Sequence, residues 1–271
     1  MASVFPCKDC VSGTIHTGKP LGEEVELCGL KVYVAPKPAE PKGVIVVFSD
    51  IFGWTLPNTR LLADAYAKNS EFIVYVPDYF PFQPIPLSYL DAYAPLSPES
   101  APSFFDSFMQ KAASMPSVLS FLVKARGGVT TPLIAKFLEA LKATSPELPI
   151  FTVGFCFGGR FSLIAGTKKV APGTVTAVAA LHPSLMSIPS DIENTIVPVS
   201  IGVGTKDDLA PLSMIEKMKS IYGKQQVSLE VKIYENMIHG FAVRGDTSVE
   251  EVANAMADAK TQVLEWFSKH L

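Results

Sequence analysis

Charged residues, cysteines and long apolar runs are all scarce in this chain of 271 residues. Only 18% of the residues are charged, and 23 Lys and Arg against 26 Asp and Glu give a formal net charge of -3 without any run of basic residues. A chain without a basic patch lacks the electrostatic attraction that binds nucleic acid or an anionic membrane. We therefore expect neither nucleic acid nor a membrane as a partner.

A membrane-spanning run and a leader pattern are missing too. The apolar stretch from Val44 to Phe48 is far shorter than the ~18 residues that indicate a membrane span. The segment from Met1 to Cys10 has no basic part followed by an apolar part, which a secretory signal would have. These two absences predict a soluble, cytoplasmic protein.

The four cysteines, Cys7, Cys10, Cys28 and Cys156, are too few for the disulfide framework that small secreted domains need. Cys7, Cys10 and Cys28 could combine with His16 as zinc ligands, but the spacing matches no strong zinc motif. We expect buried or solvated thiols there instead. The sequence predicts neither a metal nor an organic cofactor.

Hydrophobic residues, by contrast, make up 48% of the chain. This is enough for a sizeable core, and α/β domains of about 200 to 250 residues are common as single units. No Gly/Ser-rich or charged linker interrupts the chain. We therefore predict one domain over residues 1–271, and the sequence is compatible with a monomer or a homodimer.

Short β-branched runs alternate with helical patterns. Val44 to Phe48 and Phe72 to Val76 are typical of strands buried on both faces, and a helix is expected to begin between them near Pro57. Further strands are expected at 150–153, 175–181, 197–203 and 227–234, and further helices at 158–165, 211–221 and 249–270. The alternation predicts an α/β fold, with a mostly parallel, doubly wound sheet and helices on both faces. Residues 24–35 predict an N-terminal β-hairpin.

The segment at about 77–108 departs from this alternation. Between Pro77 and Pro102 it contains seven prolines interleaved with aromatic residues, and helix-like sequence follows around Phe104. A long irregular insertion in a compact domain is usually a lid, a binding loop or a disordered segment, and the aromatic content argues against disorder. We expect a lid-like cover over the substrate, with a plain structural excursion as the alternative.

Cys156 lies between Gly154 and Gly158, after an apolar strand and before a helix. This pattern is typical of a nucleophile elbow, here with cysteine in place of serine. The strand must turn sharply into the helix, so the flanking positions need small residues. The positive end of the helix dipole would also favour the thiolate. The alternative is a buried structural cysteine.

A cysteine nucleophile needs a base and an acid that orients the base, and in folds with this elbow the acid precedes the histidine. The strand-like run ending at Val203 leads into Asp207 and Asp208, and the run ending at Tyr234 leads to His239. Residue types alone leave the choice between Asp207 and Asp208 open.

The other histidines are weaker candidates for the base. His182 also follows a strand, so we expect it to line the site, while a role as the base is less favoured. His16 in the polar N-terminal region and His270 at the end of the last helix are expected to be solvated.

Four stretches, in order along the chain, resemble the landmarks of the dienelactone hydrolase family. They are Asp-Ile-Phe-Gly at 50–53, Gly-Phe-Cys-Phe-Gly-Gly at 154–159, Gly-Thr-Lys-Asp at 204–207 and His-Gly-Phe at 239–241. The likeness extends from about Gly43 to the last helix, and the hairpin region resembles the fungal-type branch. It implies the α/β-hydrolase fold, with Cys156 as the nucleophile, Asp207 as the triad acid and His239 as the base.

The resemblance also implies an oxyanion hole made by the backbone N–H groups of Ile51 and Phe157. Asp50 stands where the best-known members have a glutamate that holds the cysteine in its resting state. Members that bind carboxylated dienelactones use arginines in the lid and after the histidine; residues 77–102 contain none, and Arg244 lies near the second position. The chlorocatechol-pathway substrate is therefore not expected. The predicted substrate-binding residues are Asp50, His182, Phe241 and Arg244.

Together these features predict a hydrolase that cleaves a lactone, ester or thioester of a small, uncharged or aromatic acid through an acyl-enzyme on Cys156. A small molecule is the expected substrate. The alternative function is that of a catalytically silent family member that binds a small hydrophobic ligand or a partner. In that case Cys156 would react with alkylating agents no faster than an ordinary exposed cysteine.

Overall fold

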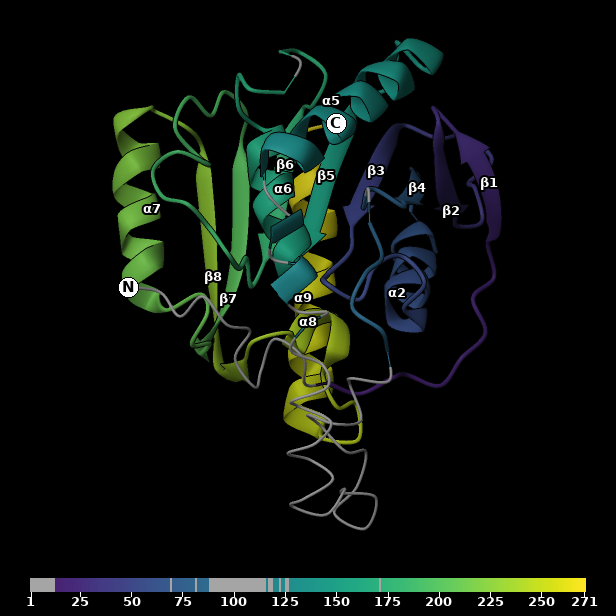
Figure 1. Cartoon of the computed structure of the whole chain (residues 1–271). Helices are drawn as coiled ribbons and strands as arrows, with labels where there is room; N and C mark the ends of the chain where they lie inside the picture. Colours follow the sequence, from purple (N-terminus) through teal and green to yellow (C-terminus); the bar gives the residue numbers. More distant parts are fainter. Residues whose placement is uncertain are drawn as a thin grey trace.

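A mixed sheet organises the described part of the chain, with strands in the order β1-β2-β4-β3-β5-β6-β7-β8 (Figure 1). The computed structural model describes residues 13–68, 70–80, 82–87, 116, 119–121, 123–124, 127–170 and 172–271. Cys7, Cys10 and most of the predicted lid lie outside these residues. The strands are β1 (Glu23–Leu27), β2 (Leu30–Val34), β3 (Gly43–Phe48), β4 (Phe72–Pro77), β5 (Ile150–Phe155), β6 (Ala177–Leu181), β7 (Val199–Lys206) and β8 (Leu229–Ile238).

The two N-terminal strands form the predicted hairpin. β1 pairs antiparallel with β2, with Leu27 opposite Leu30. The two residues between them, Cys28 and Gly29, have φ angles of 52° and 80°, and such positive angles suit the twist of a two-residue hairpin turn. β2 pairs antiparallel with β4, and the pairings from β4 through β3, β5, β6 and β7 to β8 are parallel. The mostly parallel sheet is therefore confirmed.

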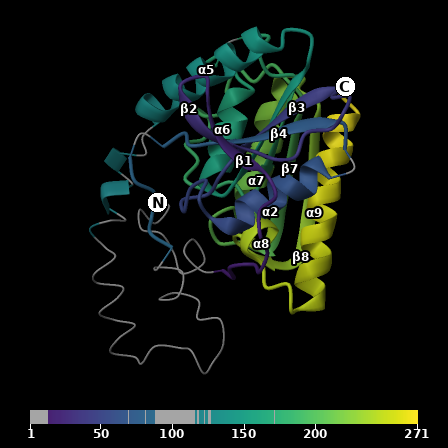
Figure 2. The same ribbon diagram turned by 90° about the vertical axis from the view of Figure 1, so that its right-hand side faces the viewer.

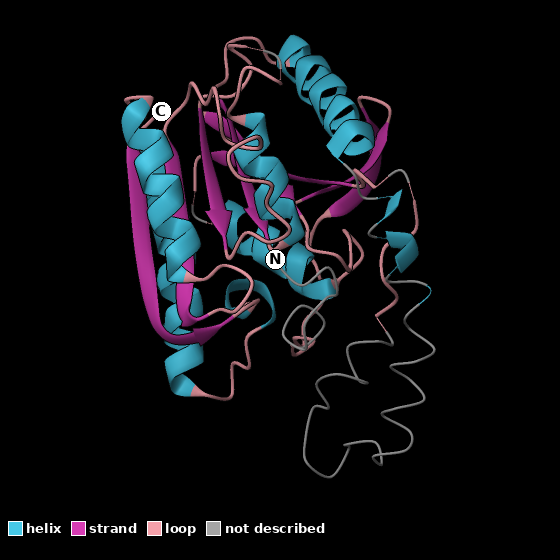
Figure 3. Cartoon of the chain, turned by 60° about the vertical axis from the view of Figure 1, so that its left-hand side comes forward, coloured by secondary structure: helices cyan, strands magenta, loops and turns pink. Residues whose placement is uncertain are grey.

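Helices cover both faces of the sheet because alternate strand residues point to opposite faces. In β3, Val44 and Val46 join the core on the side of α5, α6 and α7, and Ile45 and Val47 join the core on the side of α2 and α9. Figure 2 shows α9 on one side of the strands and α5 and α6 on the other, and Figure 3 shows helices on both sides of the sheet. The helices are α2 (Pro57–Ala67), α5 (Gly127–Thr144), α6 (Phe157–Ala165), α7 (Leu212–Lys224), α8 (Phe241–Arg244) and α9 (Glu250–Ser268).

The structure adds elements that the sequence patterns did not predict. α5 covers residues 127–144, for which no element was expected, and β8 continues to Ile238 instead of ending at 234. The short helix α8 begins directly after Gly240. Within the described ranges, none of the helices has the length and apolar character that crossing a membrane requires.

Candidate active site

The strands that end at one edge of the sheet bring the candidate residues together. Asp50 follows β3, Cys156 follows β5, Asp207 follows β7 and His239 follows β8. In open parallel sheets the carboxyl ends of the strands form the edge at which ligands bind. All four residues are buried, at 0 to 3% exposed. Residues far apart in the chain therefore meet in one desolvated site.

Cys156 occupies a sharp, strained turn between β5 and α6. Its φ and ψ are 53° and -116°, a conformation that non-glycine residues adopt rarely and usually at functional sites. The neighbouring glycines are required by space: a Cβ on Gly154 would lie 2.1 Å from the carbonyl oxygen of Gly158, and one on Gly158 would lie 2.1 Å from that of Phe48. The predicted elbow geometry is present.

His239 is oriented by Asp207. Its Nδ1 lies 3.0 Å from both carboxylate oxygens of Asp207. One of these oxygens also accepts hydrogen bonds from the backbone N–H groups of Leu209 and Ala210, at 2.9 and 2.8 Å. Asp208 is exposed. The geometry thus selects Asp207 as the carboxylate that binds the histidine.

The electrostatic surroundings of His239 favour a charged imidazole. Burial lowers the pKa of His239, but the charge of Cys156 and the hydrogen bonds to Asp207 and Cys156 outweigh burial and raise the pKa to about 10. A charged imidazole in turn favours an ion pair with the thiolate of Cys156. A thiolate is the reactive form of cysteine.

Asp50 and Arg244 form a buried ion pair beside the thiol. Arg244 Nε donates to Asp50 Oδ2 at 2.8 Å, and Asp50 Oδ1 accepts a hydrogen bond from the N–H of Phe52 at 3.0 Å. Burial, followed by the charge of Cys156, raises the pKa of Asp50 to about 6, although Arg244 opposes this rise. Arg244 Nη1 and Nη2 are buried without a hydrogen-bond partner among the described residues. The pKa of Asp50 is thus set by burial, by the positive charge of Arg244 and by the negative charge of Cys156.

His182 also lies at the site, and no acidic side chain in the described part of the chain is hydrogen-bonded to it. Its Nδ1 accepts a hydrogen bond from the backbone N–H of Cys156 at 3.1 Å, and its ring centroid is 5.1 Å from that of His239. Burial, together with the charges of His239 and Arg244, lowers its pKa well below 6.5. A neutral His182 supports the backbone of the elbow, and the histidine paired with a carboxylate is His239.

The remaining predicted residues lie around this centre. Ile51 lies three residues beyond the end of β3, Phe157 directly follows Cys156, and both are buried. The ring of Phe241 packs edge-on against that of His182, with centroids 5.7 Å apart. His16 and His270 are each half-buried, and one ring nitrogen of each lies 2.8 Å from a backbone carbonyl oxygen, that of Gly245 or Trp266. These contacts are structural.

One residue at the site was missed by the sequence analysis. Ser184 Oγ lies 3.3 Å from Cys156 Sγ, and Ser184 is fully buried. The available signal was its position three residues beyond the end of β6, at the same edge of the sheet as the other site residues. Nothing in a Pro-Ser pair by itself distinguishes such a serine from an ordinary turn residue.

Aromatic rings adjoin the nucleophile on the α6 side. The ring of Phe157 lies 5.1 Å from that of Phe121 and 5.8 Å from that of Phe80, and the ring of Phe121 lies 5.4 Å from that of Phe82. A cavity of about 920 Å³ opens beside Phe82 and Phe121, and Gln83, Ser120 and Lys124 also line it. The described part of the predicted lid therefore contributes to an apolar surface next to the elbow.

Comparison with known proteins identifies the family of the chain. The model of the dienelactone hydrolase family matches residues 30–271. The chain belongs to the dienelactone hydrolase family. Membership of this family makes the chain a hydrolase of lactones or esters, with a small-molecule substrate.

Individual relatives match over nearly the whole chain. Hydrolase pyvD of Aspergillus violaceofuscus is 26% identical over 272 residues, which cover 100% of this chain and 99% of the relative. The human carboxymethylenebutenolidase homolog is 25% identical over 272 residues, with 98% of each chain covered. The crystal structure of a dienelactone hydrolase from Anabaena variabilis has a TM-score of 0.59 at 15% identity and covers 94% of this chain and 100% of its own. The last likeness shows the α/β-hydrolase fold.

Proposed function

We propose that this family member cleaves a lactone, ester or thioester through a covalent acyl-enzyme on Cys156. The observation that supports this proposal is the constellation at the sheet edge: a thiol on a strained elbow, and a histidine with a raised pKa that is bound by a buried carboxylate. Such a nucleophile, base and orienting acid are the groups that covalent catalysis of acyl transfer requires.

Acylation begins from the ion pair. The Cys156 thiolate attacks the substrate carbonyl carbon, a C–S bond forms and the carbonyl π electrons move to oxygen. The N–H groups of Ile51 and Phe157 are the proposed donors to this oxyanion. When the intermediate collapses, the bond to the leaving oxygen or sulfur breaks, and the proton of the His239 imidazolium passes to the leaving group.

Deacylation uses the neutral His239 that acylation leaves behind. His239 accepts a proton from water, and the resulting nucleophile attacks the thioester carbon. The C–S bond then breaks, its electron pair returns to Cys156 and the acid is released. Asp207 holds the imidazole in the required tautomer throughout. Amides are poor substrates in this scheme because a thiolate leaves more readily than an amine.

The surroundings of the thiol support a small, uncharged or aromatic acyl group. The rings of Phe80 and Phe121 pack against the ring of Phe157, the residue directly after the thiol. The positive charge of Arg244 is already balanced by Asp50 at 2.8 Å, so the pair offers little net attraction to a substrate carboxylate. We therefore expect an aromatic ester to be cleaved faster than the same ester bearing a carboxylate on its acyl group.

The first experiment compares hydrolysis of p-nitrophenyl acetate by the unaltered enzyme, Cys156→Ala and Cys28→Ala, with intact-mass detection of the acyl-enzyme. Cys28 is a matched control because it is a half-buried thiol in the hairpin turn. We expect turnover and the acetyl adduct to be lost in Cys156→Ala and retained in Cys28→Ala. Equal turnover in all three proteins would reject the cysteine mechanism, and hydrolysis no faster than the uncatalysed reaction in all three would favour the silent binding function.

A further inference from the structure

The loop after β6 makes close contacts with both the backbone and the sulfur of Cys156. The N–H of Ser184 donates to the carbonyl oxygen of Cys156 at 3.0 Å, and the N–H of Cys156 lies 3.1 Å from the carbonyl oxygen of Leu181. In addition, Ser184 Oγ lies 3.3 Å from Cys156 Sγ. The backbone contacts fix the position of this hydroxyl relative to the nucleophile.

The charges around the sulfur decide which atom is the donor. His239 faces Cys156 from the loop after β8, and its pKa is raised partly by the charge of Cys156. Asp50 after β3 and Tyr79 after β4 feel the same negative charge, and Arg244 balances Asp50. A thiolate has no proton to donate, so in the ion-paired state the Ser184 hydroxyl is the donor.

We propose that Ser184 is a further catalytic residue, whose hydroxyl donates a hydrogen bond to the Cys156 thiolate in the resting enzyme and to the same sulfur when it leaves the acyl-enzyme. This inference rests on the proposed function, in which Cys156 is the nucleophile. Hydrogen bonds to an ionised acceptor are stronger than those between neutral groups. The hydroxyl therefore stabilises the sulfur most when the sulfur is charged.

The contribution of Ser184 follows the charge on sulfur through the reaction. In acylation the sulfur lone pair forms the C–S bond, and the hydroxyl loses its charged acceptor. In deacylation the C–S bond breaks, the electron pair returns to sulfur, and the hydroxyl again donates to a thiolate. Ser184 keeps its own proton in both steps, while His239 carries the proton that is transferred.

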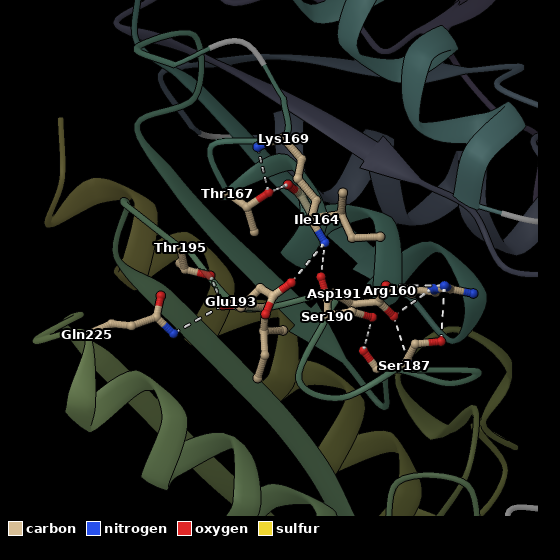
Figure 4. A network of polar contacts seen from close by, with 11 residues as sticks. Arg160, Ile164, Thr167, Lys169, Ser187, Ser190, Asp191, Glu193, Thr195 and Gln225 are labelled. Carbon is tan, nitrogen blue, oxygen red and sulfur yellow. Dashed lines mark hydrogen bonds and ion pairs between the residues drawn. The ribbon is translucent and has the colours of Figure 1, made fainter.

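The loop that holds Ser184 is attached to the helix that follows the nucleophile. Arg160, on the first turns of α6, pairs with Asp191 through Nε and Nη2 at 2.9 and 3.2 Å. Asp191 in turn accepts a hydrogen bond from the N–H of Ser187, and Lys169 donates to the carbonyl oxygen of Ser190. Figure 4 shows this network of polar contacts. The network holds residues 187–191 of this loop against α6 and the segment that follows α6.

The test is the pH dependence of the thiolate in Ser184→Ala. Thiolate ultraviolet absorbance, with the matching Cys156→Ala background subtracted, and kcat/KM for p-nitrophenyl acetate are measured from about pH 5 to about pH 10. Losing one donor to a charged sulfur is expected to move the acidic midpoint upward by about one pH unit, and to lower kcat/KM about tenfold below that midpoint. Above the midpoint the rate stays close to that of the unaltered enzyme.

Two further variants separate catalysis from structure. Ser184→Thr keeps the hydroxyl and should return the midpoint toward its original value. Ser162→Ala removes another fully buried hydroxyl of the same region, which is bonded to Thr152 and not to the thiol, and should leave the midpoint unchanged. A merely structural role for Ser184 would slow the reaction at every pH without moving the midpoint.

The outcomes distinguish this inference from the proposed function. An unchanged midpoint in Ser184→Ala would overturn the role of Ser184, and so would a downward shift, which would mean that the thiol donates to the hydroxyl. If Cys156→Ala retains full turnover, the proposed function is rejected, and the inference about Ser184 is rejected with it. If Cys156→Ala is inactive and Ser184→Ala has the unaltered profile, only the inference about Ser184 fails.

Discussion

At the scale of single residues, the site depends on buried charges that stabilise one another. His239 has a raised pKa because Cys156 and Asp207 oppose the effect of burial. Asp207 is itself held by two backbone N–H groups, so its carboxylate cannot rotate away from the imidazole without losing them. The residue types identified the histidine and a pair of aspartates, and the contacts distinguish Asp207 from Asp208.

Asp207→Asn should reduce kcat strongly while the fold remains. The amide retains the shape of the carboxylate, but it stabilises the wrong imidazole tautomer. It also cannot stabilise the positive charge of the imidazolium ion. We expect kcat for p-nitrophenyl acetate to fall by about 10³-fold to 10⁴-fold. Asp208→Asn is the matched control and should remain active. A fully active Asp207→Asn enzyme would contradict the assignment of the acid.

The raised pKa of His239 also predicts a pH dependence of stability. The folded-state pKa of about 10 exceeds the ordinary value of 6.5, so protonation favours the folded state. This contribution is complete below 6.5 and is lost as the pH rises from 6.5 to about 10. In the ion pair Cys156 holds no proton, whereas the unfolded thiol keeps its proton up to an ordinary pKa of about 8.5, so the two effects compensate near neutral pH. We therefore expect the thermal midpoint of the unaltered enzyme to fall mainly above about pH 8.5, and that of Cys156→Ala, which has no thiol to compensate, to begin falling near 6.5. Parallel curves for the two proteins would refute the coupling.

At the scale of elements, the strand-to-helix connections place the chemistry. Gly154 and Gly158 allow β5 to meet α6 with backbone atoms in close contact, and this local requirement made the elbow predictable. α5 was not predictable in the same way, since Gly127, Gly128 and Pro132 weaken its helical pattern. Packing of its buried face, which includes Phe137 and Leu141, against the core overrides that local preference.

Glycine substitutions should test the elbow. In Gly158→Ala the new methyl group would meet the Phe48 carbonyl oxygen at 2.1 Å, so the backbone must move. We expect a loss of about 3 kcal/mol or more in the free energy of unfolding, with loss of activity. Gly223→Ala in α7 meets nothing within 4 Å and should be neutral or stabilising by up to about 1 kcal/mol. Urea denaturation measures both, and equal effects would contradict the packing argument.

At the scale of the whole molecule, the Asp50–Arg244 pair connects the loop after β3 to α8 across 194 positions of the chain. Its two side chains are almost completely buried, at 0 and 1% exposed. The surrounding segments are joined by Asn58, which donates to the carbonyl oxygens of Thr14 and Val243. The N-terminal residues and the site therefore share one set of polar contacts.

Removing one partner of this pair should destabilise the fold more than removing both. Asp50→Asn leaves the Arg244 charge buried without its anion, and we expect unfolding to become easier by about 3 kcal/mol. The double variant Asp50→Asn with Arg244→Met should recover part of that loss because no unpaired charge remains. Chemical denaturation of the single and double variants measures the coupling. Additive losses would show that the two residues do not stabilise each other.

The sequence by itself determined the strand and helix alternation, the hairpin, the elbow around Cys156 and the position of His239 after a strand. These features depend on neighbouring residues, such as the β-branched runs and the two glycines, so local patterns suffice to predict them. The tertiary structure decided that Asp207 binds His239, that Arg244 pairs with Asp50 and that Ser184 contacts the thiol. Those contacts join residues from different loops at the edge of the sheet. Which loops lie next to one another depends on how distant segments of the chain pack.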